Sequence, residues 1–245
     1  PRMWGGVTNA AELRRIADVA DKYQVPMVKV TGGQRIDLLG IRKEDLPGVW
    51  KDLDMPSGHA YGKSIRTVKT CVGSEFCRFG TQNSTQMGID LEHALFNMWS
   101  PHKVKLAVSG CPRNCAESGI KDVGIIGVDS GWELYIGGNG GIKTEAGEFF
   151  VKVKSAEEVM EYSLAFLQLY REEAFYLERT VHYMQRVGMD HIKKAVLDDA
   201  ERRKALHQRL LFSLSFEQDP WQEQLSKPQL KKEFDRIAVK QLENA

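Results

Sequence analysis

The chain has 245 residues, of which 42% are hydrophobic, and its 34 Lys and Arg residues nearly balance its 33 Asp and Glu residues. A chain of this length can bury a sizeable core without disulfides, and its formal charge of +1 argues against a large nucleic-acid footprint. No apolar run is long enough to span a membrane, and we expect a protein of the reducing cytoplasm.

The first lobe is predicted to be small and to cover residues 1–58, because Pro and Gly mark a boundary at its end. Asn9 and Glu12 have the spacing of a helix-capping signal, and the apolar residues after them recur at helical spacing. A strand is then predicted over 25–30 and a short helix over 46–53. Helix and strand signals therefore alternate in this lobe, as in one βαβ-like unit.

The second lobe is predicted to be a mixed α/β unit over 59–213, followed by a tail over 214–245. Ser155 opens a second capping signal, and the helix that begins there is expected to run to Arg186, with Gly188 as its stop. The other predicted elements are helices over 90–99 and 190–212 and strands over 123–128, 132–136 and 148–153.

All four cysteines lie in two short segments, with the spacing C-x5-C at Cys71 and Cys77 and C-x3-C at Cys111 and Cys115. Four thiolates brought together from two loops suit an iron-sulfur cluster. A tetrahedral zinc site uses the same ligands, although its usual spacing is close to C-x2-C. Inert packing of buried cysteines is the third interpretation.

Positive charge is concentrated around the cysteines. Residues 60–125 contain eight Lys or Arg against five Asp or Glu, although the whole chain is nearly neutral. A solvated basic face would explain part of this excess. Lys103 and Lys105 alternate with Val104, so in a strand both amines lie on one face, where they suit a small anion or a polycarboxylate.

The two cysteine segments resemble the motif of a known family. Residues 67–80, which contain TCVGSEFCRFG, and residues 103–115, which end in GCPRNC, are similar to the sirohaem and [4Fe-4S] motif of the nitrite and sulfite reductases. Residues 30–41 resemble the strand-turn-strand of the ferredoxin-like half that precedes this motif. Within the family, the sequence of these segments is most similar to that of the C-terminal part of the large subunits of NADH-dependent assimilatory nitrite reductases.

The resemblance implies a set of ligands. Cys71, Cys77, Cys111 and Cys115 would hold the cluster, and Cys115 would also link it to the sirohaem iron. Cations line the open face of that iron in the family, and the residues that match them are Arg66, Lys103 and Lys105, with Arg35 either as a further one or as a partner of a sirohaem carboxylate.

Sirohaem is rich in carboxylates, which require cations, backbone amides and polar side chains around them. The glycine-rich segment 137–141 either exposes its amides to an anion or forms a tight turn between strands. The candidate cofactor-binding side chains are Thr31, Gln34, Arg35, Arg78, Thr81, Gln82, Asn83, Arg113, Asn114 and Lys121.

The resemblance implies an α+β enzyme with a ferredoxin-like small lobe, a sirohaem and iron-sulfur lobe and C-terminal helices, which reduces nitrite to ammonium. Sulfite reduction is the alternative within the family, and a non-catalytic iron-sulfur or zinc module is the alternative outside it. No Gly-rich dinucleotide fingerprint follows a strand, so FAD and NADH are expected only in missing sequence or in a partner chain that donates electrons. A homodimer would rebuild the pairing of two repeats in sulfite reductases, and His59 is a candidate proton relay.

Overall fold

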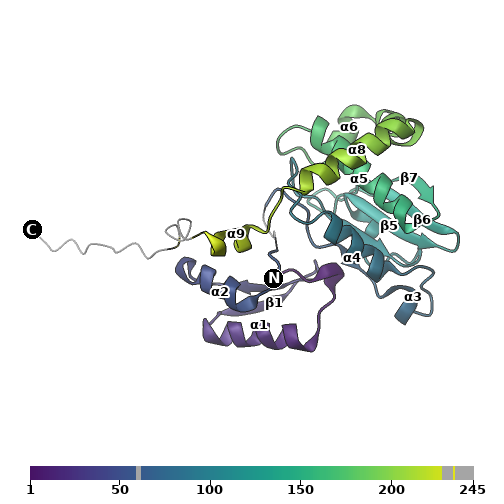
Figure 1. Cartoon of the computed structure of the whole chain (residues 1–245). Coiled ribbons are helices and arrows are strands. Elements are labelled where there is room, and N and C mark those ends of the chain that lie inside the picture. The colour runs from purple at the N-terminus through teal and green to yellow at the C-terminus, as the bar shows by residue number, and fades with distance from the viewer. Residues whose placement is uncertain (59–61, 228–233, 235–245) are drawn as a thin grey trace, which may run out of the picture.

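The computed structural model describes residues 1–58, 62–227 and 234, and these residues form a small lobe and a large lobe (Figure 1). His59 and most of the predicted tail, beyond residue 227, lie outside the described residues. Each lobe has its own sheet and its own cluster of buried apolar side chains. Within the described ranges, no helix is long and apolar enough to cross a membrane.

The small lobe packs two helices beside a two-stranded antiparallel sheet. The Asn9 side chain accepts the N–H groups of Ala11 and Glu12, in the first turn of α1, at 3.0 Å each, which confirms the predicted cap. The strands form a hairpin whose turn, residues 31–35, reaches the large lobe, where Gln34 bonds to Thr70. The elements of this lobe are α1 (Ala10–Lys22), β1 (Met27–Val30), β2 (Ile36–Leu39) and α2 (Leu46–Leu53), with 3₁₀ turns at Trp4–Gly6 and Lys43–Asp45.

The large lobe is built on a five-stranded sheet of order β3-β4-β5-β6-β7. Strands β3, β4 and β5 run parallel, whereas β6 and β7 are antiparallel to their neighbours. The carboxyl ends of the three parallel strands therefore meet at one edge of the sheet. The strands span Lys69–Thr70, Leu106–Ser109, Val123–Val128, Gly131–Ile136 and Glu148–Val153, which confirms the strands predicted at 123–128 and 148–153.

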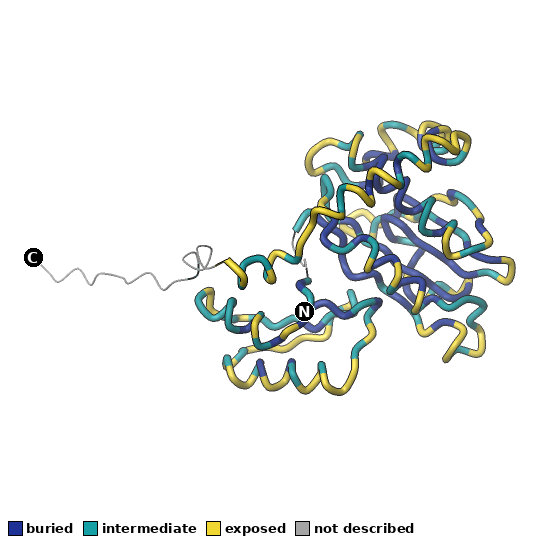
Figure 2. Tube along the Cα trace, in the orientation of Figure 1, coloured by how far each residue is buried: buried dark blue, intermediate teal, exposed yellow. Residues whose placement is uncertain are grey.

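Helices cover this sheet and bury its apolar side chains, so that most of the buried chain lies in the strands and the helices packed on them (Figure 2). The core joins Val108 and Leu134 of the sheet to Leu91 of α4 and Phe166 of α5. The helices of this lobe are α3 (Gly73–Phe76), α4 (Ser84–Ala94), α5 (Ala156–Glu173), α6 (Thr180–Val187), α7 (Met189–Lys193) and α8 (Ala200–Leu214), with a 3₁₀ turn at Ser118–Ile120 and a π-helical turn at Lys194–Asp198. The last helix, α9 (Pro220–Ser226), instead packs against α2 of the small lobe, where Trp221 stacks on Trp50 (Figure 1).

The helix predicted over 90–99 begins and ends earlier than expected, because α4 spans Ser84–Ala94. Its start is set by Asn83, whose side chain accepts the Gln86 N–H at 3.0 Å. Its end precedes Asn97, whose φ of 64° lies in the left-handed region and stops a right-handed helix.

The helix predicted from Ser155 to Arg186 begins as expected but is interrupted. The Ser155 hydroxyl accepts the Glu158 N–H, and the Glu158 carboxylate accepts the Ser155 N–H, which forms the capping box. A turn that contains Leu177, with a φ of 67°, separates α5 from α6. Gly188 ends α6 as predicted.

The helix predicted over 190–212 is also divided. Asp199 has φ −105° and ψ 91°, which are not helical values, and its side chain accepts the Arg202 N–H at 2.8 Å. This cap makes α8 a separate helix that follows the π-helical turn, because an N-cap residue lies outside the helix it begins.

Candidate functional site

The four cysteines come together at one cavity of about 480 Å³, here called the cysteine cavity. Cys71 follows β3 and Cys77 ends α3, whereas Cys111 and Cys115 follow β4. Because β3 and β4 are parallel neighbours, the two loops leave the sheet at the same edge. Cys111 is buried, Cys115 is exposed, and none of the four forms a disulfide.

Glycines let the two cysteine loops pack backbone against backbone. A Cβ atom on Gly110 would lie 2.8 Å from the Gln82 carbonyl oxygen and 2.9 Å from the Gly73 Cα. Gly73 has a φ of 62°, which side chains disfavour. The Gly110 carbonyl accepts the N–H groups of Thr81 and Gln82 at 2.8 and 3.0 Å. The loops therefore form one unit that presents the thiols together.

The environment of the thiols suits a cluster. The Cys71 Sγ accepts the Gly110 N–H at 3.1 Å and lies 3.2 Å from the Ser84 hydroxyl oxygen. Such hydrogen bonds to sulfur tune the potential of iron-sulfur clusters. Among the described residues, no three His, Cys, Asp or Glu side chains are close enough to hold a metal ion.

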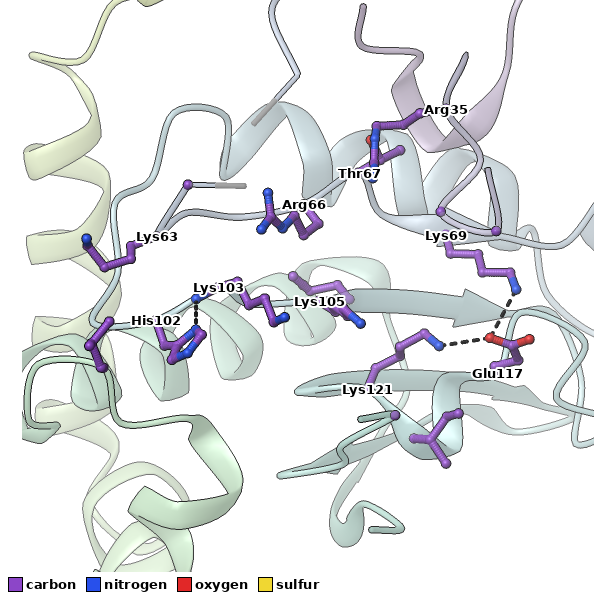
Figure 3. A pocket seen from close by; sticks show the side chains of 17 residues that line it. Arg35, Lys63, Arg66, Thr67, Lys69, His102, Lys103, Lys105, Glu117 and Lys121 are labelled. Atoms are coloured by element: carbon purple, nitrogen blue, oxygen red, sulfur yellow. Dashed lines mark hydrogen bonds and ion pairs between the residues drawn. The ribbon is translucent and has the colours of Figure 1, made fainter. Parts of the chain in front are cut away.

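A second cavity, of about 700 Å³, is lined mainly by cations and is here called the cationic cavity (Figure 3). In Figure 3, Arg66 lies across from Lys103 and Lys105, and Glu117 lies at one end of the cavity. Glu117 is the one acidic side chain among the described residues of its wall. The cations are Arg35, Lys63, Arg66, Lys69, Lys103, Lys105 and Lys121.

The two cavities share a wall. Thr67 and Lys69 line the cationic cavity, whereas Thr70 and Cys71 line the cysteine cavity. The turn between β1 and β2 also borders both cavities. Gln34 lines the cysteine cavity, and its neighbours Gly33 and Arg35 line the cationic cavity. The Gln34 side chain donates to the Thr70 carbonyl at 2.7 Å and accepts the Thr70 N–H at 2.8 Å. This pair of bonds thus fixes the border at which the thiols of one cavity adjoin the cations of the other.

Lys103 and Lys105 both line the cationic cavity although they precede β4. The intervening Val104 bonds to the segment on one side, because its N–H donates to the Ser64 carbonyl at 3.1 Å. The N–H groups of the two lysines face the other way, where β5 has not yet begun. They donate instead to side chains: Lys103 to His102 Nδ1 at 2.7 Å and Lys105 to Asp122 Oδ2 at 2.8 Å.

Asp122 is fully buried and joins three parts of the lobe. Besides the Lys105 N–H, its carboxylate accepts Arg179 Nη2 at 3.1 Å and the Thr180 hydroxyl. Desolvation lowers the pKa of Lys105, and the charges of Lys103 and Arg179 lower it further. Desolvation, followed by the charge of Arg179, likewise lowers the pKa of His102, which favours its neutral form.

At the opposite end, Glu117 bridges two lysines. Its Oε2 lies 3.1 Å from Lys69 Nζ and 3.0 Å from Lys121 Nζ. The hydrogen bonds from Lys121 and then Lys69 lower the pKa of Glu117. Two ammonium groups are thus held around one carboxylate of the chain itself at this end of the cavity.

The structure brings most of the predicted site residues to the two cavities. Arg35, Arg66, Lys103, Lys105 and Lys121 line the cationic cavity, and Gln34 and Arg113 line the cysteine cavity with the four cysteines.

Other predicted cofactor-binding residues do not line either of these cavities. They bond within the protein: the Thr31 hydroxyl to the Arg35 backbone, the Thr81 hydroxyl to the Gly110 carbonyl, Gln82 Nε2 to the Val128 carbonyl, Asn83 Nδ2 to Glu75, and Asn114 Oδ1 to Ser109 and Gly119, while the Arg78 guanidinium lies 4.5 Å from the centre of the Phe79 ring.

The glycine-rich segment 137–141 packs against the site rather than forming its floor. The Gly137 N–H donates to the Asp122 carbonyl at 3.0 Å, and a Cβ on Gly138 would lie 2.5 Å from the Lys121 carbonyl oxygen. Of the five residues, Gly140 lines the cationic cavity.

Sequence reasoning gave no role to Lys69, His102, Glu117, Asp122 or Arg179. Two of them could have been found by their closeness to a cysteine in the sequence, since Lys69 lies two residues before Cys71 and Glu117 lies two residues after Cys115. No pattern in the sequence indicated a role for Arg179, because its contact with Asp122 joins residues 57 positions apart.

Comparison with known proteins gives two matches to family models. Residues 61–204 match the model described as "Nitrite and sulphite reductase 4Fe-4S domain", and residues 1–56 match "Nitrite/Sulfite reductase ferredoxin-like half domain". The chain is 61% identical over 240 residues to a nitrite reductase [NAD(P)H] from Bacillus subtilis, covering 98% of this chain but 30% of that relative. It is 34% identical to an assimilatory-type sulfite reductase from Nitratidesulfovibrio vulgaris, covering 80% of this chain and 90% of that relative.

Among solved structures, a dissimilatory sulfite reductase superposes with a TM-score of 0.71 at 17% identity, covering 78% of this chain and 66% of that one. This likeness concerns the fold, which confirms the expected α+β architecture with a ferredoxin-like part. The matched model covers more than half of the chain and contains all four cysteines together with Lys103 and Lys105. The chain therefore belongs to the nitrite and sulphite reductase family and carries its iron-sulfur domain together with a ferredoxin-like half domain.

Proposed function

We propose that this chain forms the site at which nitrite is reduced to ammonium, with a [4Fe-4S] cluster in the cysteine cavity and sirohaem in the cationic cavity. The common border of these cavities carries the proposal, because it places the thiols that would hold an electron carrier next to the cations that would hold the anion. The chain spans 30% of the length of the nitrite reductase it matches, so the activity of a whole enzyme is part of the proposal.

The thiols are assigned as cluster ligands, and Cys115 as the one shared with the haem iron. Cys115 is the exposed member of the four, which leaves it accessible to a second group. The Gly110 N–H, which donates to the Cys71 Sγ at 3.1 Å, supports thiolate charge at this position.

The cationic cavity suits the carboxylates of sirohaem. The Arg35 Nε is buried without a hydrogen-bond partner among the described residues, and its ion-pair partner Asp37 lies 3.7 Å away, so a closer carboxylate would satisfy it. Lys69 and Lys121 already hold one carboxylate, that of Glu117, in their present arrangement. Bound there, sirohaem would supply the iron that binds and reduces the anion.

Arg66, Lys103 and Lys105 are assigned to the anion. Arg66 keeps its charge and acts as a clamp, because a guanidinium stays protonated. Lys105 is suited to donate protons, because desolvation and then the charge of Lys103 lower its pKa. Lys103 holds the anion from the same wall of the cavity.

The visible spectrum of the purified protein, with iron and sulfide analysis, tests the cofactors. A chlorin-type band together with iron and acid-labile sulfide is expected. A colourless protein that contains zinc would contradict both reductase assignments. The non-catalytic module would then be the remaining function. Steady-state assays with reduced methyl viologen then test the substrate, and a higher kcat/KM for nitrite than for sulfite is expected.

Sulfite reduction is the second candidate. Its support is the assimilatory-type sulfite reductase, which has nearly the length of the matched segment, since 90% of it is covered. The same clamp and proton donors would serve sulfite, so a higher kcat/KM for sulfite would select this function.

Electrons are proposed to come from a flavin domain or subunit that binds FAD and NADH outside these residues, in the cytoplasm. A homodimer is proposed as well, because β1 leaves the side chains of Met27, Val28 and Val30 exposed. Light scattering of the cofactor-loaded protein tests it, and a monomeric mass would remove the dimer without affecting the cofactor assignment.

A further inference from the structure

The turn between α5 and α6 contains a leucine in an unfavourable backbone conformation. Leu177 has a φ of 67°, in the left-handed region where a side chain is disfavoured and glycine is the usual residue. Strained residues of this kind persist only where the surrounding structure holds them, and they gather at ligand-binding sites. A side chain at this position therefore needs a role that offsets the unfavourable backbone conformation.

Contacts on both sides hold this turn in place. The Leu177 N–H donates to the Pro101 carbonyl at 3.1 Å. The next residue, Glu178, accepts the Tyr170 hydroxyl with its carbonyl and the Phe175 N–H with its carboxylate at 2.8 Å. Arg186 lies 2.8 Å from the same carboxylate. The backbone of Leu177 is thus determined by its neighbours.

The side chain of Leu177 gains little from the core of the protein. It is 52% exposed, so burial of apolar surface does not offset the strain of its backbone. It does line the cationic cavity, whose wall is otherwise made mostly of charged residues and glycines. The apolar side chains in that wall are those of Leu106, Ile120 and Leu177.

A planar tetrapyrrole combines an apolar ring with a charged rim. The cations of the cavity can hold the rim, but the ring needs apolar contacts to leave water. Leu106 is almost fully buried in the sheet, so its side chain is largely committed to the core. We propose that the turn holds Leu177 out of the core so that its side chain packs against the apolar ring of the bound macrocycle, an inference that rests on the proposed function.

The test compares Leu177→Ala and Leu177→Gly with the wild-type full chain. The probe is sirohydrochlorin, the iron-free parent of sirohaem, and a fluorescence titration gives its dissociation constant. The thermal unfolding temperature of each protein is measured without the probe. Both variants are expected to raise the dissociation constant about tenfold, because each removes most of one leucine contact. Leu177→Gly is expected to unfold up to about 3 °C higher than wild type, because glycine relieves the strained conformation.

The matched control is Gln24→Gly, since Gln24 is an exposed residue with a φ of 49° that lines neither cavity. It is expected to raise the unfolding temperature in the same way and to leave the dissociation constant unchanged. Equal dissociation constants for wild type and Leu177→Ala would overturn the inference, whatever the unfolding temperatures. Failure of the wild-type chain to bind the probe would overturn the proposed function with it.

Discussion

The backbone N–H of Lys105 donates to the carboxylate of Asp122 at 2.8 Å, and this bond takes the place of a ladder bond in the sheet. Asp122 precedes the first residue of β5, so its side chain provides the acceptor that the strand does not yet provide. The same carboxylate holds Arg179 from the start of α6. The position of a cavity lysine is therefore tied to the C-terminal helices.

Asp122→Asn is expected to destabilise the protein and to slow nitrite reduction. The amide can still accept the Lys105 N–H, but the largely buried Arg179 loses its counter-ion. We expect a loss of about 3 kcal/mol in the free energy of unfolding. The rate should fall about tenfold or more, because Lys105 shifts when its support weakens. Chemical denaturation and the methyl viologen assay measure the two effects.

Asp45→Asn is the control for this change. Asp45 forms a pair with Arg42 at 2.7 Å on the surface of the small lobe. Such pairs contribute little, so stability and rate should match wild type. A variant of Asp122 that behaves like this control would show that the buried pair does not position Lys105.

Lys103→Met is expected to raise the pKa of Lys105. Desolvation is the largest cause of its lowered pKa, and the charge of Lys103 is the next. Removing that charge makes it easier for Lys105 to keep its proton. Since the neutral amine is the form that reacts with acetic anhydride, labelling of Lys105 should begin at a higher pH in the variant, as mass spectrometry can follow.

Lys63→Met provides the comparison, because Lys63 lines the same cavity but is not among the causes of the shift. The pH dependence of Lys105 labelling in the Lys63→Met variant should be the same as in wild type. An equal shift in both variants would mean that the cavity acts through its total charge rather than through the neighbouring lysine.

Gly110→Ala is expected to prevent cluster assembly. The added Cβ would lie 2.8 Å from the Gln82 carbonyl oxygen, so the two cysteine loops would have to move apart. Gly58→Ala is the control, because Gly58 lines neither cavity and a Cβ there would lie 3.6 Å from its nearest neighbouring atom, which is an ordinary contact. Iron and sulfide per chain should fall sharply in the first variant and stay at the wild-type value in the second. Full iron content in Gly110→Ala would contradict the close packing of the loops.

Cys115→Ser is expected to lose the cluster and its coupling to the haem together, because the proposal shares this thiolate between them. Ser84→Ala should keep both and lower the reduction potential, since it removes a hydroxyl 3.2 Å from the Cys71 sulfur. Iron analysis and a potentiometric titration measure these outcomes. Full activity of Cys115→Ser would rule out its bridging role.

Local signals were sufficient for the ends of several elements and for the cysteine pairs. The cap at Asn9, the capping box at Ser155 and the stop at Gly188 form between residues a few positions apart, so the sequence contains both partners. The alternation of Lys103 and Lys105 likewise placed both lysines on one wall.

Local signals failed where distant residues decide the backbone. The division of the predicted helix at Leu177 depends on Pro101, which lies far away in the sequence. The bridge from Glu117 to Lys69 and the bonds of Asp122 to Arg179 join segments that meet only in the folded sheet. Sequence spacing contains no information on which of many charged residues will be neighbours.

The thiols, the main cations and the family motif can be identified from the sequence alone, because these are properties of residues and of short spacings. That the thiols and cations line two adjoining cavities follows from the folded arrangement of the chain. That arrangement arises because β3 and β4 are parallel neighbours and because Gln34, from a different lobe, bonds to the backbone of Thr70.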